Sequence, residues 1–135
     1  MEYQYSLEFT VRDYECDIQG IVNNANYQHY LEHTRHEFLV SQGISFAEMH
    51  DEGIDLIVTR VVIDYKFPLR SRDKFLVRLN LRRKGNARLI FEQEIVRLPD
   101  EKQIVKAEVT GIASRNGRPV SPVIVISKLE NRLMH

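Results

Sequence analysis

The chain has 135 residues, of which 43% are hydrophobic and 28% are charged, a composition typical of a globular domain and not of a disordered or fibrous chain. The 19 basic residues balance the 19 acidic ones, so no overall positive field exists to hold nucleic acid or an anionic membrane. The single cysteine, Cys16, excludes an internal disulfide and a multi-cysteine zinc site. We expect one domain over residues 1–135, without a membrane span or signal peptide, in the cytoplasm.

Alternation of apolar and polar side chains predicts five strands along the chain. They cover about 2–12, 56–67, 74–82, 89–95 and 105–114. On the second strand, the apolar positions expected to share one face are Ile57, Val61, Ile63, Tyr65 and Phe67. Asn116-Gly117 is expected to form the turn that closes the fifth strand. The tail from Ser121 has both helix-start and strand character.

One segment changes to the helical period, and its apolar side chains form a single stripe. The stripe predicts a helix from about Asn26 to Gln42, which the asparagines before it can cap and which Gly43 can end. Ser45 and Glu48 indicate a short capped turn after it. The order of strand, helix and four further strands implies an antiparallel sheet with the long helix packed on one face.

The segment between the first strand and the helix has the residue types of a catalytic loop. Three acidic residues, of which Asp17 is the last, precede Gly20 and the helix start. The free backbone N–H groups of Asn23 and Asn24 would lie near the positive end of the helix dipole, where they can stabilise an oxyanion. A carboxylate just before them can activate water or attack a carbonyl. This combination suits hydrolysis of an activated ester.

The same segment resembles the hotdog-fold acyl-CoA thioesterases of the 4-hydroxybenzoyl-CoA thioesterase type. The shared pattern reads Asp17-x-x-Gly20-x-Val22-x-x-x-x-Tyr27-x-x-x-x-Glu32-x-x-Arg35. A weaker match is Tyr65-x-x-Pro68 followed by Asp73. The resemblance implies an α+β hotdog fold, in which a long helix is wrapped by a curved antiparallel sheet of about five strands. It also implies homodimers, often paired into homotetramers, with the acyl site at the subunit interface and no metal or cofactor.

The resemblance makes Asp17 the catalytic carboxylate, as nucleophile or general base, with the Asn24 backbone N–H as oxyanion donor beside Gly20. The implied reaction is hydrolysis of an acyl-CoA or acyl carrier protein thioester to a carboxylic acid and a thiol. The further substrate contacts expected are Ile21, Val22, Asn23, Tyr27 and Glu32. At the end of the third strand, a basic run suits the phosphates of coenzyme A, and it consists of Arg82, Arg83 and Lys84. Many relatives have histidine where this chain has Ile21, which leaves the acyl class open.

Several of these residues also have purely structural interpretations. Asp17 can cap a short turn, Tyr27 lies on the apolar stripe, and Glu32 can belong to a solvated helix face. His29 and His33 have the spacing of a metal-binding pair, but no third ligand is evident. Besides the enzyme, the open alternatives are a non-catalytic acyl-binding or assembly protein of the same fold and, more remotely, a cystatin-like binding module.

Overall fold

The structure is a computed structural model that describes residues 3–121. Along the chain, the elements are β1 (Tyr5–Thr10), a 3₁₀ turn (Asp13–Glu15), α1 (Asn24–Ser41), α2 (Phe46–Asp51), β2 (Ile54–Tyr65), β3 (Lys74–Lys84), β4 (Arg88–Leu98), β5 (Lys102–Arg115) and β6 (Arg118–Val120). The ambiguous tail falls almost entirely outside the described residues. No helix of residues 3–121 has the length and apolar character needed to cross a bilayer.

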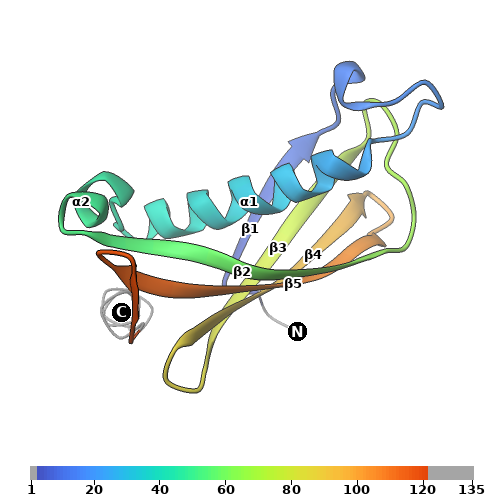
Figure 1. Ribbon diagram of the computed structural model, residues 1–135. Coiled ribbons are helices and arrows are strands. Elements are labelled where there is room, and N and C mark those ends of the chain that lie inside the picture. The colour runs from blue at the N-terminus through green and yellow to red at the C-terminus, as the bar shows by residue number, and fades with distance from the viewer. Residues whose placement is uncertain (1–2, 122–135) are drawn as a thin grey trace.

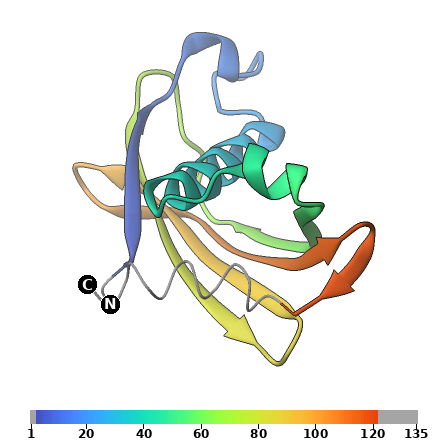
Figure 2. The same ribbon diagram turned by 90° about the vertical axis from the view of Figure 1, so that its left-hand side faces the viewer.

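The strands form one antiparallel sheet in the order β1-β3-β4-β5-β2, and the short β6 pairs with β5. The sheet curls around α1, which lies along its concave face (Figures 1 and 2). This confirms the predicted α+β architecture of a long helix wrapped by a curved sheet. The strands β1 and β2 form the two edges of the main sheet.

The apolar stripe of α1 is the side of the helix that faces the sheet. Its buried members are Tyr27, Tyr30, Leu31, Thr34, Phe38 and Leu39. Side chains of β3, among them Phe75 and Val77, are fully buried opposite this helix. Because burial of each large apolar side chain is worth about 1.5–3 kcal/mol, this contact holds the helix and both of its ends in place.

The structure confirms two predictions about turns, the Ser45 cap and the Asn116-Gly117 turn. The Ser45 side chain accepts a hydrogen bond from the Glu48 backbone N–H at 3.2 Å, which caps α2 as expected. Asn116 and Gly117 have φ angles of 51° and 82°, the left-handed values that a two-residue hairpin turn requires. They join β5 to β6.

The predicted apolar face of β2 is wrong at Ile57. The register of the pairing between β2 and β5 shifts between Val58 and Arg60, so Thr59 is an extra residue in the strand. Such a bulge reverses the alternation of faces. As a result Leu56 packs against the core, whereas the Ile57 side chain is 45% exposed. The strand also ends at Tyr65, two residues before Phe67.

Candidate active site

Asp17 lies in an exposed turn that leads directly into α1, at the end of the molecule where the chain projects from the sheet (Figure 1). The Asp17 N–H donates to the Ile21 carbonyl, and the Gly20 N–H donates to the Asp17 carbonyl, both at 2.9 Å. Gly20 has a φ of 79°, which favours glycine. A Cβ at this position would meet nothing within 4 Å, so the backbone conformation of the turn, and not crowding, explains this glycine.

One oxygen of the Asp17 carboxylate has a structural role. Its Oδ1 accepts a hydrogen bond from the Gln19 backbone N–H at 2.8 Å, so the turn-capping interpretation holds for this atom. Within residues 3–121, Oδ2 accepts no hydrogen bond. The turn therefore holds the carboxylate in a defined orientation and leaves its second oxygen open for chemistry.

The start of α1 leaves one backbone donor open. Asn23 is the N-cap, and its Oδ1 accepts from the Ala25 N–H at 2.9 Å, while its carbonyl accepts from the Asn26 N–H at 2.9 Å. The described chain offers no acceptor to the remaining first-turn donor, the Asn24 N–H. The Glu15 carbonyl accepts from both the Asn23 N–H and Asn26 Nδ2, which fastens the acidic loop to the helix start. The free donor lies at the positive end of the helix dipole, where anions bind.

Two of the expected substrate contacts are core residues. Tyr27 is 2% exposed, and its hydroxyl accepts a hydrogen bond from the Leu69 backbone N–H at 2.9 Å. Burial raises the pKa of the Tyr27 phenol above its ordinary value, although the Leu69 bond opposes that shift. Val22 is equally buried, and half-buried Ile21 forms a bridge with Arg70. These side chains position the loop.

A cavity of about 590 Å³ lies between α1 and the edge strand β2, and we call it the α1–β2 cavity. Its size is that of a small-molecule site. Its apolar wall is formed by Leu56, Val58, Leu89 and Phe91, and its polar groups on α1 include Glu32 and Arg35. On β5 the cavity is bounded by Gly111, where the missing side chain leaves space beneath the helix. Asp17 does not line this cavity.

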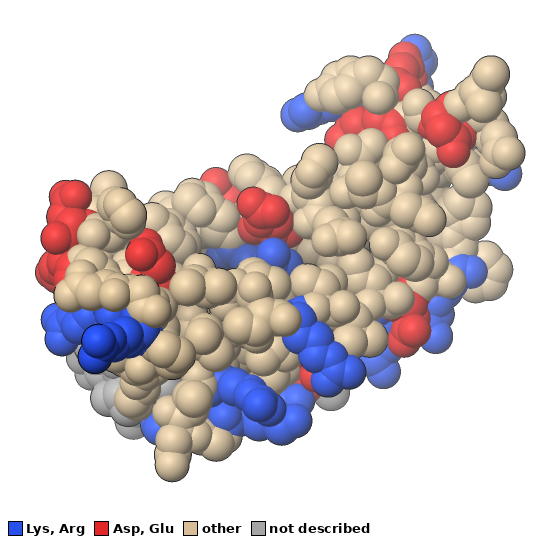
Figure 3. All heavy atoms as spheres, in the orientation of Figure 1, with Lys and Arg blue, Asp and Glu red and all other residues tan. Residues whose placement is uncertain are grey.

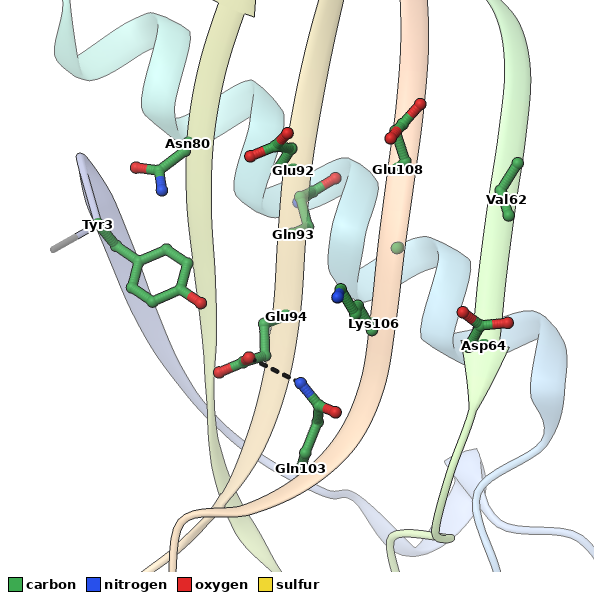
Figure 4. A pocket seen from close by; sticks show the side chains of 11 residues that line it. Tyr3, Val62, Asp64, Asn80, Glu92, Gln93, Glu94, Gln103, Lys106 and Glu108 are labelled. Carbon is green, nitrogen blue, oxygen red and sulfur yellow. Dashed lines mark hydrogen bonds between the residues drawn. The ribbon is translucent and has the colours of Figure 1, made fainter. Parts of the chain in front are cut away.

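A second hollow, of about 540 Å³, lies on the face of the sheet that points away from α1 (Figure 4). Two of its carboxylates are paired: Arg82 pairs with Glu92 at 2.7 Å and Arg78 with Glu94 at 3.4 Å. Gln103 also donates to Glu94 at 2.8 Å. These ion pairs and hydrogen bonds engage Glu92 and Glu94, while Asp64 and Lys106 also line the hollow.

The basic run at the end of β3 lies far from the Asp17 turn. The β3–β4 hairpin and the loop before α1 occupy opposite ends of the molecule in both ribbon views (Figures 1 and 2). Arg82 is tied to Glu92, and Arg83 Nε donates to the Gly85 carbonyl at 2.9 Å. Lys84 borders a hollow of about 280 Å³ together with Arg60 and Arg88. Basic side chains also collect along the lower part of the face in Figure 3.

The edge strand β2 exposes apolar side chains, which alternation alone does not predict. Between 39% and 49% of each of these side chains is exposed, and they are Ile57, Val58, Val61, Val62 and Tyr65. Within the described chain, β2 has a neighbour only on its β5 side. An apolar strand with an open edge is a surface on which another strand pairs.

Comparison with known proteins places this chain in a family. Residues 11–123 match the family model of the thioesterase-like superfamily, so the chain belongs to that superfamily. It is 37% identical over 131 residues to the acyl-acyl carrier protein thioesterase ATL3, chloroplastic, of Arabidopsis thaliana, covering 97% of this chain and 68% of that protein. The chain is accordingly a thioester hydrolase with the hotdog fold.

Solved structures share this fold. The crystal structure of a protein from Aquifex aeolicus, described as hypothetical, is 32% identical, with a TM-score of 0.84 over 93% of this chain and 98% of that one. A 1,4-dihydroxy-2-naphthoyl-CoA thioesterase from Synechocystis has a TM-score of 0.88 over 97% of this chain and 98% of that one. At 17% identity, the latter likeness concerns the fold alone.

Proposed function

We propose that the chain hydrolyses acyl thioesters of coenzyme A or acyl carrier protein, with Asp17 as the catalytic carboxylate. The observation that carries this proposal is the turn that holds Asp17 immediately before an unsatisfied helix start. Its Oδ1 is anchored by Gln19, and the Asn24 N–H has no acceptor in the described chain. A carboxylate and an oxyanion donor on one rigid segment are the two groups that acyl transfer to water requires.

In the proposed reaction, Asp17 either attacks the thioester carbonyl carbon or takes a proton from a water molecule that attacks it. The carbonyl oxygen becomes an oxyanion, which the Asn24 N–H stabilises. The carbon–sulfur bond then breaks and the thiolate leaves. In the covalent route, water hydrolyses the resulting anhydride and releases the carboxylic acid. Single-turnover hydrolysis in ¹⁸O water that leaves ¹⁸O in Asp17 would establish the covalent route, since only an anhydride attacked at the enzyme carboxyl gives this result.

The proposed enzyme is a homodimer that pairs through β2 and can pair again into a homotetramer. Two-fold antiparallel pairing of β2 with a second copy would cover the exposed apolar side chains. It would also bring the Tyr65 end of one strand beside the Ile54 end of the other. The helix start lies at the Tyr65 end, since the rings of Tyr27 and Tyr65 are 5.7 Å apart. The cavity lies at the other end, beside Leu56 and Val58.

This pairing would complete the site from two copies. The partner's Asp17 would approach the α1–β2 cavity, whose apolar wall would receive the acyl group while Glu32 borders its mouth. Coenzyme A phosphates would contact cations of the β3–β4 hairpin; Lys84 fits this role better than Arg82, which is already paired. The single cysteine is compatible with a reducing compartment such as the cytoplasm.

A thiol-release assay over short, aromatic and long acyl-CoAs and an acyl carrier protein thioester tests the proposal. We expect turnover with at least one acyl class. Asp17→Asn should lower kcat at least about a hundredfold, the usual contribution of a positioned base, with an unchanged unfolding midpoint. If no thiol is released from any thioester, the alternative of a non-catalytic acyl-binding protein is favoured. Near-normal turnover by Asp17→Asn would remove this residue from the catalytic role.

A further inference from the structure

Arg35 brings a positive charge to the α1–β2 cavity and is held there by a buried amide. Arg35 Nη1 donates to Gln93 Oε1 at 3.0 Å, and Gln93 Nε2 donates to the Leu31 carbonyl at 3.0 Å. Gln93 is 2% exposed on β4. Because both ends of this amide are engaged, its orientation is fixed, and so is the guanidinium bound to it.

The guanidinium has no acidic partner. No carboxylate oxygen of residues 3–121 lies within 4.0 Å of Arg35, whereas Arg78 and Arg82 have such partners. Burial lowers the pKa of Arg35, and the more distant charge of exposed Glu32 only opposes that effect. One of the five N–H donors is used by Gln93, and Arg35 borders a cavity lined by apolar side chains and by three histidines of α1. A cation held in this way is costly unless an anion joins it.

We propose that Arg35 binds a carboxylate on the acyl group, so that the cavity accepts half-thioesters of dicarboxylic acids. The planar guanidinium presents paired donors that match the two oxygens of a carboxylate. The apolar wall fits the methylene chain between the thioester and that carboxylate. This inference rests on the proposed function for its substrate, but not for the carboxylate site itself.

The acids of the loop before α1 are weaker candidates for this partner. In a dimer they would approach the cavity, yet each already accepts a hydrogen bond within its own subunit. Asp17 accepts from Gln19, Glu15 accepts from the Arg12 N–H at 2.7 Å, and Asp13 is bonded to Ser71. A carboxylate that arrives with the substrate can offer both of its oxygens to the guanidinium.

Matched acyl-CoA pairs test the proposal: succinyl against butyryl, adipoyl against hexanoyl, and suberoyl against octanoyl. We expect the wild type to prefer the carboxylated member at one length at least. Arg35→Met should lower the ratio of kcat/KM between the members at least about tenfold, mainly through KM, because a hydrogen-bonded charge pair is lost. Arg35→Lys should restore part of the ratio. Arg118→Met, a change in an exposed arginine of β6, is the matched control and should leave the ratio unchanged.

Calorimetric binding of free adipate and suberate gives a readout that needs no catalysis. The wild type should bind one of them at least about tenfold more tightly than Arg35→Met does, at equal unfolding midpoints. If no thioester is hydrolysed while this difference persists, the proposed function fails and the carboxylate site stands. If the wild type and Arg35→Met have equal kcat/KM ratios and equal affinities for the free diacids, the proposed carboxylate site is wrong. A double-mutant cycle of Arg35→Met and Glu15→Gln, measured on the dimer dissociation constant, tests whether Arg35 instead pairs with an acid of a second copy. Energetic coupling between the two changes would show such a pair and would overturn the proposed substrate class.

Discussion

The hydroxyl of Tyr27 accepts a hydrogen bond from the backbone N–H of Leu69 at 2.9 Å, and this bond fastens the first turn of α1 to the segment after β2. The Leu69 carbonyl in turn accepts from the Val22 N–H at 2.8 Å. Both bonds are buried, and together they fix the short stretch between Asp17 and the helix. The motif tyrosine therefore positions the candidate catalytic groups without touching them.

Removing that hydroxyl should cost stability. Tyr27→Phe leaves the Leu69 N–H buried without an acceptor, so the free energy of unfolding in urea should fall by about 1–2 kcal/mol. Tyr65→Phe is a suitable control, since its ring touches Tyr27 but its side chain is 46% exposed. Equal unfolding curves for wild type and Tyr27→Phe would mean that the bond contributes nothing.

Filling the α1–β2 cavity should change acyl selectivity. A Cβ on Gly111 would lie 3.4 Å from the Ile57 carbonyl oxygen, an ordinary contact, so Gly111→Ala should fold and turn over normally. Gly111→Leu places a larger side chain in the cavity. It should lower kcat/KM for long acyl groups more than for acetyl, at least about tenfold, because the apolar space is lost. Retention of long-chain activity by Gly111→Leu would show that the acyl group binds elsewhere.

A charge on the edge of β2 should break the dimer. Val61→Lys introduces the side chain with which natural edge strands block pairing. In sedimentation velocity, we expect this variant to be monomeric at concentrations where the wild type is dimeric, and to lose its activity with the dimer. Gln28→Lys adds the same charge on the exposed face of α1 and should remain dimeric. A wild-type chain that is monomeric at micromolar concentration contradicts the proposed pairing.

A histidine and an acid at the junction of α2 and β2 predict a pH dependence. His50 Nδ1 lies 3.0 Å from Asp55 Oδ1, and this hydrogen bond raises the pKa of His50 above its ordinary 6.5. The pair should therefore stabilise the junction fully below that value, with the contribution fading as the pH rises through the raised pKa. An NMR titration should give His50 a pKa above that of a free histidine, and Asp55→Asn should return this pKa to the ordinary value. An unshifted His50 in the wild type would contradict this.

The sequence predicts the parts of the fold that local patterns specify. The stripe from Tyr27 to Leu39 marks the buried face of α1, and Asn116-Gly117 marks the last hairpin. Ile57 is placed on the wrong face because nothing local signals the bulge at Thr59, which only the pairing with β5 reveals. The exposed edge of β2 is missed for the same reason, since alternation does not show which strand lacks a neighbour.

The α1–β2 cavity is also missed, although two signals for it are present. Gly111 lies inside a strand, where glycine often marks a close approach or an empty space. Gln93 is a polar residue on the face of β4 that otherwise holds Leu89, Phe91 and Ile95. Only the folded chain brings Gln93 to Arg35, because these residues are joined across the helix and the sheet and not along the sequence.

Intersubunit complementation tests the central claim most directly. Asp17→Asn lacks the carboxylate and Gly111→Leu lacks the cavity, so each homodimer should have at most about a tenth of the wild-type activity toward a long acyl thioester. In a purified heterodimer of the two, one site would combine the intact Asp17 of one copy with the intact cavity of the other. We expect about half of the wild-type activity per dimer, since one of two sites is restored. A heterodimer as inactive as its parents would show that Asp17 does not act on the cavity of its partner.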